Sequence, residues 1–308
     1  MNFEIKVLEV KSTDNIHTLK GKIYIPTGEI KGLFHLVHGM TEYIDRYDHL
    51  MYFLAENGYV AFGYDHLGHG KTAENDDELG FIAHKDGWKY LVKDVAAFTR
   101  AVKKMYPSLP TVLMGHSMGS FMVQKYELLY PKMFNGHILM GCAKADALFK
   151  IGSIAANILY FFNKSNKRLK IMDTLAFGSF NKAFKPNKTE HDWLTKDVEI
   201  CREYHDSRTC GFICTASFYK EFYNNVSQIP NKKYNSLFDK NYPILLVGGS
   251  DDMVSNRGKK LIALTEFYKK QSNKVTQIIY DKDRHEILNE FDKDKVIEDI
   301  VNWIKNIL

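Results

Sequence analysis

The sequence predicts an α/β fold with a mostly parallel central sheet, helices on both faces and an inserted helical cap. Short apolar segments alternate with segments of helical periodicity in the first half of the chain and again near its end. This alternation is typical of parallel sheets, because each crossover between parallel strands usually contains a helix. A long middle segment without the alternation separates the two parts, and we interpret it as the cap.

The predicted elements before the cap follow one another in strict succession. The apolar or alternating patterns predict strands at Phe3–Val10, Leu19–Ile25, Leu33–Val37, Tyr59–Asp65, Thr111–Met114 and His137–Met140. Helical spacing predicts helices at Arg46–Asn57, Trp88–Met105 and Met118–Tyr130. After the cap, the patterns predict strands Ile244–Val247 and Val275–Tyr280, and helices near Ser255–Lys269 and at Lys293–Ile307. We therefore assign residues 1–142 and 243–308 to the core and residues 143–242 to the cap.

The composition excludes several classes of protein. With 308 residues, 45% hydrophobic and 26% charged, the chain resembles an ordinary soluble domain with an insertion. The net charge of +5 is small and dispersed along the chain, so we expect no nucleic-acid partner.

The sequence shows no targeting or membrane-spanning segment. The N-terminus lacks a signal-peptide pattern, and the longest nearly apolar run, Ile151–Phe162, is too short to span a bilayer. The 4 cysteines lack the spacing of a zinc site. We expect reduced thiols, no metal and a cytoplasmic protein.

The stretch GHSMG, residues Gly115–Gly119, carries the clearest chemical signal. In the pattern G-x-S-x-G, a strand turns sharply into a helix and holds a serine nucleophile at the apex, where flanking glycines avoid clashes. The alternative is a small-residue turn without catalytic function. The position of Ser117 between a predicted strand and a predicted helix favours the nucleophile.

A serine hydroxyl needs a base, and in this arrangement the acid and the histidine follow the serine in the chain. His285 is the single histidine after Gly248, and it follows the predicted strand that ends at Tyr280. The stretch PILLVGGSDDMVS offers two acids, Asp251 and Asp252. The residues themselves leave the choice between these acids open.

An oxyanion hole requires two backbone N–H groups directed at the developing negative charge. Met118 offers one, at the N-terminus of a helix whose dipole favours negative charge. Met40 offers the other, because Gly39 after the strand Leu33–Val37 lets the backbone approach closely. The alternative is that His38 and Gly39 form only a turn.

With these residues considered, the chain resembles an α/β-hydrolase of the monoacylglycerol lipase and lysophospholipase-like family. The stretches HGMTEYIDRY, DHLGHGKT, GHSMGS and RHEILNE carry the resemblance, which covers nearly everything except the cap. The resemblance implies the α/β-hydrolase fold and a reaction without a cofactor. It also implies that Ser117, Asp252 and His285 form a catalytic triad, and that the backbone N–H groups of Met40 and Met118 form the oxyanion hole.

The chain departs from the family pattern at two places. Tyr43 stands where the family usually has histidine, and Lys282 and Asp283 stand where it usually has glycine before the triad histidine. Glu42 and Arg46 resemble the family's buried ion pair that supports the oxyanion loop. The alternative for this pair is an exposed helical pair that contributes about 0.3–0.5 kcal/mol.

The cap is expected to select the substrate. Apolar residues recur at helical spacing, which predicts a face that packs on the core, at Leu148, Ile151, Ala155, Ile158 and Phe162. Ile154, Leu159 and Phe161 lie outside that face, so we predict that they bind the substrate. Basic residues follow at Lys164, Lys167, Arg168 and Lys170, so we leave peripheral membrane contact through the cap open.

These observations predict a serine hydrolase that cleaves esters of single long acyl chains, such as monoacylglycerols or lysophospholipids, through an acyl-enzyme. A general carboxylesterase or a proline-type aminopeptidase on the same fold remains an alternative, since a fold does not fix the substrate. An acyltransferase is a further alternative. A ligand receptor without catalytic function belongs to another class, and a chain with every triad role filled speaks against it.

Overall fold

An eight-stranded sheet forms the centre of the computed structural model, which describes residues 2–130, 132–231 and 239–308. The strand order is β1-β2-β4-β3-β5-β6-β7-β8. The strands are β1 (Phe3–Lys11), β2 (Thr18–Pro26), β3 (Gly32–Val37), β4 (Tyr59–Tyr64), β5 (Thr111–His116), β6 (Gly136–Met140), β7 (Ile244–Gly249) and β8 (Val275–Tyr280). Neighbours from β4 to β8 in this order pair in parallel, whereas β1–β2 and β2–β4 pair antiparallel. The predicted mostly parallel sheet is confirmed.

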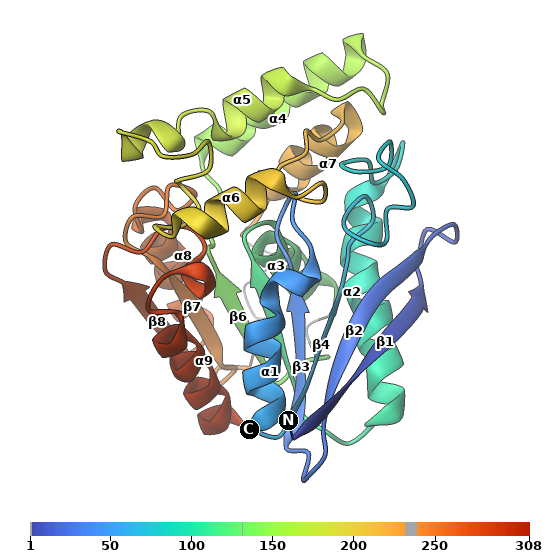
Figure 1. The fold of residues 1–308 in the computed structure, drawn as a ribbon, viewed down its shortest axis with the longest axis vertical. Coiled ribbons are helices and arrows are strands. Elements are labelled where there is room, and N and C mark those ends of the chain that lie inside the picture. The colour runs from blue at the N-terminus through green and yellow to red at the C-terminus, as the bar shows by residue number, and fades with distance from the viewer. Residues whose placement is uncertain (1, 131, 232–238) are drawn as a thin grey trace.

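Helices cover both faces of this sheet (Figure 1). They are η1 (Ile44–Tyr47), α1 (Asp48–Glu56), α2 (Gly87–Met105), α3 (Met118–Leu129), α8 (Lys259–Lys269), η4 (Ile287–Asn289) and α9 (Lys293–Ile307). Buried residues of α1 and α9 form one apolar core with one face of the sheet. Residues of α2, α3 and α8 form the core on the other face. Strands β3, β5 and β7 are buried along their whole length, which explains their continuous apolar sequences.

One predicted helix begins later than expected. The pattern predicted a helix near Ser255–Lys269, but α8 begins at Lys259. Asn256, Arg257 and Gly258 have positive φ angles of 52°, 53° and 75°. A right-handed helix requires negative φ, so these residues form a turn instead.

The segment between β6 and β7 contains α4 (Ala147–Phe162), α5 (Lys170–Phe177), η2 (Asn181–Phe184), α6 (Val198–Asp206) and α7 (Ala216–Val226). These helices lie over the carboxyl end of the parallel strands (Figure 1). Residues 232–238, which fall within the predicted cap, lie outside the described part of the chain. Within the described ranges, no helix has both the length and the apolar composition needed to cross a membrane.

Candidate active site

Ser117 lies in the sharp turn between β5 and α3. Its φ and ψ angles are 52° and −117°, a combination that is strained for any residue with a side chain. A Cβ atom at Gly115 would collide with the carbonyl oxygen of Gly119, and one at Gly119 would collide with that of Val37. The two glycines of the GHSMG stretch therefore allow the turn, as the sequence pattern predicted.

The loops after β7 and β8 bring Asp252 and His285 together. Asp252 Oδ1 lies 2.9 Å from His285 Nδ1, and both side chains are buried. Asp251 takes no part in this contact, and its backbone N–H donates to the carbonyl oxygen of Asp283. Of the two acids that the sequence left open, Asp252 is the one that contacts His285.

The environment of Asp252 favours its ionised form. Burial alone would raise the pKa of this carboxyl, but the charge and hydrogen bond of His285 and the backbone N–H of Val254 lower it below its usual value. The carboxylate accepts the Val254 N–H at 2.8 Å. Asp252 can therefore hold the His285 ring in one tautomer and stabilise its protonated form.

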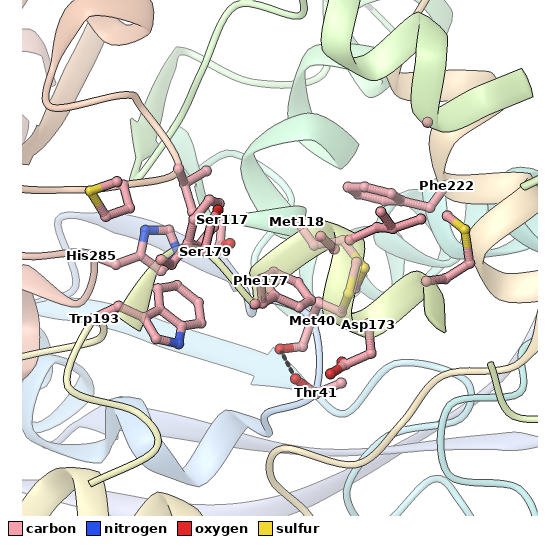
Figure 2. A pocket seen from close by; sticks show the side chains of 18 of the residues that line it. Met40, Thr41, Ser117, Met118, Asp173, Phe177, Ser179, Trp193, Phe222 and His285 are labelled. Atoms are coloured by element: carbon pink, nitrogen blue, oxygen red, sulfur yellow. Dashed lines mark hydrogen bonds between the residues drawn. The ribbon is translucent and has the colours of Figure 1, made fainter. Parts of the chain in front are cut away.

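The loop after β3 approaches Ser117 closely. A Cβ atom at Gly39 would lie 3.2 Å from the Cβ of Ser117, so a larger residue would crowd the serine. The N–H of Gly39 donates to Glu42 Oε1 at 2.5 Å, which fixes the backbone just before Met40. Met40 and Met118 both line the cavity in which Ser117 and His285 lie (Figure 2). This placement suits the oxyanion role predicted for their N–H groups.

Glu42 belongs to a buried ionic network behind this loop. Arg46 Nη1 lies 2.9 Å from Glu42 Oε2 and 2.6 Å from Glu286 Oε1. Tyr47 donates its hydroxyl to Glu42 Oε1 at 2.7 Å and lies at the same distance from His116 Nδ1. The Glu42–Arg46 pair predicted from the resemblance is therefore buried, and the alternative of an exposed helical pair is wrong.

The charges in this network stabilise one another. Burial alone would lower the pKa of His116, but the hydrogen bond and charge of Glu42 raise it above its usual value. Burial alone would raise the pKa of Glu42, but His116 and Arg46 lower it well below its usual value. The negative charge of Glu42 therefore lies between the N–H of Gly39 and the ring of His116, which directly precedes Ser117.

A cavity of about 840 Å³ extends from Ser117 and His285 and is lined by residues of the helices α4, α5 and α7. Its walls are predominantly apolar and include Met118, Phe121, Phe149, Ala155, Met172 and Phe222. Asp173 also lines the cavity, where burial raises the pKa of its carboxyl. The size is typical of a pocket for one small-molecule ligand.

The structure does not place Ile154, Leu159 and Phe161 on the wall of this cavity. Ile154 is 61% exposed and Phe161 is 81% exposed, while Leu159 packs against the core. The cavity is instead lined from α4 by Leu148, Phe149, Ile151, Gly152 and Ala155. Residues seven apart share one helix face, so Ile154 and Phe161 both point away from the face that contains Leu148 and Ala155.

Sequence reasoning missed several residues at this site. Trp193 lies beside His285, Glu286 binds Arg46, and Tyr47 joins Glu42 to His116. Glu286 could have been noticed as a charged neighbour of His285 in a largely buried loop. No local signal marked Trp193, because its partner lies in a distant part of the sequence.

Comparison with known proteins identifies the family. The family model described as "Serine aminopeptidase, S33" matches residues 28–292, most of the chain. The chain belongs to this family. Together with the relatives below, this membership confirms the α/β-hydrolase fold, the resemblance to monoacylglycerol lipases and the assignment to serine hydrolases.

Two relatives and one solved structure match this S33 family member over most of their length. It is 25% identical over 289 residues to a protein named monoglyceride lipase homolog from Monkeypox virus, covering 92% of this chain and 93% of that protein. It is 27% identical over 285 residues to the monoglyceride lipase of Homo sapiens, covering 91% and 84%. A solved carboxyl esterase from Bacillus coagulans in complex with glycerol superposes with a TM-score of 0.90 at 26% identity, and covers 98% of each chain.

Proposed function

We propose that this S33 family member hydrolyses carboxylic esters that carry one long acyl chain, such as monoacylglycerols or lysophospholipids. The apolar cavity that begins at Ser117 and His285 is the observation that carries this proposal. An acyl chain is desolvated in such a cavity, and each buried CH₂ group contributes about 0.8 kcal/mol to the free energy of binding. The relatives named monoglyceride lipase support the same substrate class.

In the proposed mechanism, Ser117 attacks the ester carbonyl while His285 accepts its proton. Asp252 holds the imidazole and stabilises its positive charge. The N–H groups of Met40 and Met118 bind the oxyanion. When the tetrahedral intermediate collapses, His285 gives its proton to the leaving alcohol, which departs and leaves an acyl-enzyme. Water, activated by His285, then releases the fatty acid. The reaction needs only these groups of the chain.

The proposal includes peripheral contact with a lipid surface through α4 and α5. Large apolar side chains on these helices are more than half exposed, at Leu148, Ile151, Ile154, Ile158, Phe161, Phe162, Ile171 and Leu175. The neighbouring residues Lys164, Lys167 and Lys170 are exposed and suit an anionic bilayer. Leu148, Ile151 and Leu175 also line the cavity, which supports a route for lipid from the bilayer to Ser117.

An aminopeptidase is the second candidate, because carboxylates are present in the cavity. Asp173 and Glu190 both line it and could bind the ammonium group of an amine substrate. The family description also names an aminopeptidase. The ester proposal is preferred because apolar side chains make up most of the cavity wall.

A substrate panel distinguishes these functions. The purified protein is given esters of rising chain length, monoacylglycerols, lysophospholipids and aminoacyl amides, beside labelling with a fluorophosphonate probe. We expect kcat/KM to rise with acyl length and to exceed that for every amide. Faster cleavage of proline amides would establish the aminopeptidase. Acyl transfer to added alcohols that outpaces hydrolysis would establish an acyltransferase, and absence of both labelling and turnover would favour a receptor.

A further inference from the structure

Residues 191–197, in the segment between β6 and β7, are bound to the loop that carries His285. The N–H of Glu286 donates to the carbonyl oxygen of Leu194 at 2.7 Å. Thr195 Oγ1 donates to the carbonyl oxygen of Asn289 at 2.8 Å. Lys196 Nζ donates to Asp283 Oδ1 at 2.6 Å. The 191–197 segment therefore contacts the histidine loop both before and after His285.

Arg284 adds contacts on both sides of Trp193. Its Nη1 donates to the carbonyl oxygens of Asp192 and Thr195, the latter at 3.0 Å. The N–H of Trp193 itself donates to Asn181 Oδ1 at 3.1 Å. The backbone that presents the indole is thus held from the histidine loop and from η2.

The Trp193 indole packs against the His285 imidazole (Figure 2). Their ring centroids lie 5.3 Å apart with an interplanar angle of 30°. Phe177 also stacks on the indole, with centroids 5.6 Å apart and an angle of 14°, and Phe180 packs against it at 5.4 Å. The indole is therefore restrained by its own neighbours while it contacts the imidazole.

We propose that Trp193 is a positioning residue for the general base, which restrains the His285 ring and stabilises its protonated form through the π face of the indole. The proposal rests on the proposed function, in which His285 takes the proton of Ser117. Aromatic faces attract nearby cations, most strongly when the ring is that of tryptophan. A side chain fixed by packing also keeps its neighbour in the productive orientation. The inserted segment would then take part in catalysis as well as in substrate selection.

Other charged and titratable groups also face His285, and the experiment leaves them unchanged. Asp252 contacts its Nδ1 from the loop after β7, and His116 approaches from the end of β5 with ring centroids 4.8 Å apart. The neighbouring groups on the histidine loop and their partners are Glu286 with Arg46, Asp283 with Lys196, and Arg284. A variant that alters the indole alone therefore reports the contribution of Trp193.

The test is the pH dependence of kcat/KM for Trp193→Leu and Trp193→Phe with a short, soluble ester. The acid limb of this profile reports the free enzyme's base. Loss of the indole should lower the pKa of this limb by about 0.5–1 unit, because the imidazolium loses a cation–π partner. Leucine keeps an apolar side chain at this position. Water that enters the space left by the indole would favour the charged imidazole and raise the pKa, so it cannot produce the expected decrease. Trp193→Phe retains a ring and should fall between the wild type and Trp193→Leu.

Phe222→Leu is the matched control, because it removes an aromatic ring from the same cavity wall. Its acid limb should keep the wild-type pKa. If Trp193→Leu does not fold, fluorinated tryptophan incorporated at all 3 tryptophans supplies a second measurement with little steric change. Fluorine withdraws electron density from the indole face, so the acid limb should again move to lower pH. Trp88 and Trp303 are buried in the two cores and have no ring contact with His285 among those described.

The outcomes separate this proposal from the proposed function. Wild-type protein without Ser117 labelling or without an acid limb would contradict the proposed function. A labelled, active wild type whose acid limb is unchanged in folded Trp193→Leu or in the fluorinated protein would overturn the role of Trp193. An equal shift in Phe222→Leu would also overturn it, because the effect would then belong to the cavity in general.

Discussion

Arg46 binds Glu286 through both terminal nitrogens of its guanidinium group, at 2.6 and 2.7 Å. Glu286 directly follows His285 in the chain, and the same guanidinium group contacts Glu42 at 2.9 Å. Glu42 in turn accepts the N–H of Gly39. One largely buried cation therefore joins the loop proposed to bind the oxyanion to the loop proposed to supply the base.

Replacing Arg46 by methionine should lower the free energy of unfolding by about 3–5 kcal/mol, because two buried carboxylates lose their counter-charge. Urea denaturation measures this difference. The matched control is Arg202→Met, which breaks an ion pair whose side chains are 59% and 72% exposed. That control should change stability by less than about 1 kcal/mol. Equal losses in the two variants would contradict a structural role for the Arg46 network.

Asp252→Asn should reduce kcat on the order of 10⁴-fold, because an amide at this position favours the wrong tautomer of the imidazole. Asp251→Asn is the matched control, since it changes the neighbouring carboxylate and should reduce kcat far less. Steady-state kinetics with a soluble ester measure both. Similar losses, or the reverse ranking, would show that Asp252 does not orient His285.

Ser117→Ala should abolish fluorophosphonate labelling and reduce activity at least ~10³-fold, because the members of a triad act as a unit. Ser120→Ala is the control, because Ser120 Oγ donates to the carbonyl oxygen of Ser117 and its side chain is buried. Labelling that persists in Ser117→Ala, or that is lost only in Ser120→Ala, would assign the nucleophile elsewhere.

Ala155→Asp should depress hydrolysis of long-chain esters much more than that of acetates, because it places a charge on the cavity wall. The neighbouring change Ile154→Asp, on the exposed face of α4, should preserve that chain-length preference in solution and weaken binding to anionic vesicles. Chain-length profiles and vesicle flotation measure the two effects, with thermal unfolding as the control for folding. Parallel behaviour of the two variants would contradict the division of α4 into two faces.

Acid should destabilise the protein partly through His35. Burial lowers the pKa of this histidine from its usual 6.5 to about 3. Between these values the unfolded chain binds a proton that the folded chain does not. Stability from this group is therefore complete above pH 6.5 and falls as the pH approaches 3. His35→Gln should reduce the slope of unfolding free energy against pH by about 1.4 kcal/mol per unit between about pH 6 and 4. Urea titrations at several pH values test this, and a slope that is the same in His35→Gln and in the wild type would contradict it.

Structural features that depend on residues adjacent in the sequence could be predicted from the sequence. The turn at Ser117 could be predicted because the strand, the glycines and the following helix are adjacent in the chain. Likewise, His285 could be predicted because it follows Ser117 in the chain and lies just after a predicted strand. The residues alone left the choice between Asp251 and Asp252 open, because it depends on how one loop turns. The resemblance implied Asp252, which is the acid that contacts His285.

The cavity wall could not be predicted from apolar periodicity. Helix α4 is apolar on its exposed face as well as on its inner face, so the usual contrast between polar and apolar sides is missing. Contacts such as Trp193 on His285 join distant parts of the chain and leave no periodic pattern. They become visible only when the segment between β6 and β7 is placed over the sheet.

The hydrogen bonds between residues 191–197 and the histidine loop also bear on how this enzyme could be re-engineered or diversify. Helix α4 supplies much of the cavity wall, and in the described part of the chain no hydrogen bond joins it to that loop. Its exchange between homologues should therefore alter selectivity and leave the base in place. Exchanging the entire cap, residues 143–242, would remove Leu194, Thr195 and Lys196 together with α4. Productive chimaeras therefore join their parents within the segment, ahead of residue 191, rather than at the edges of the sheet.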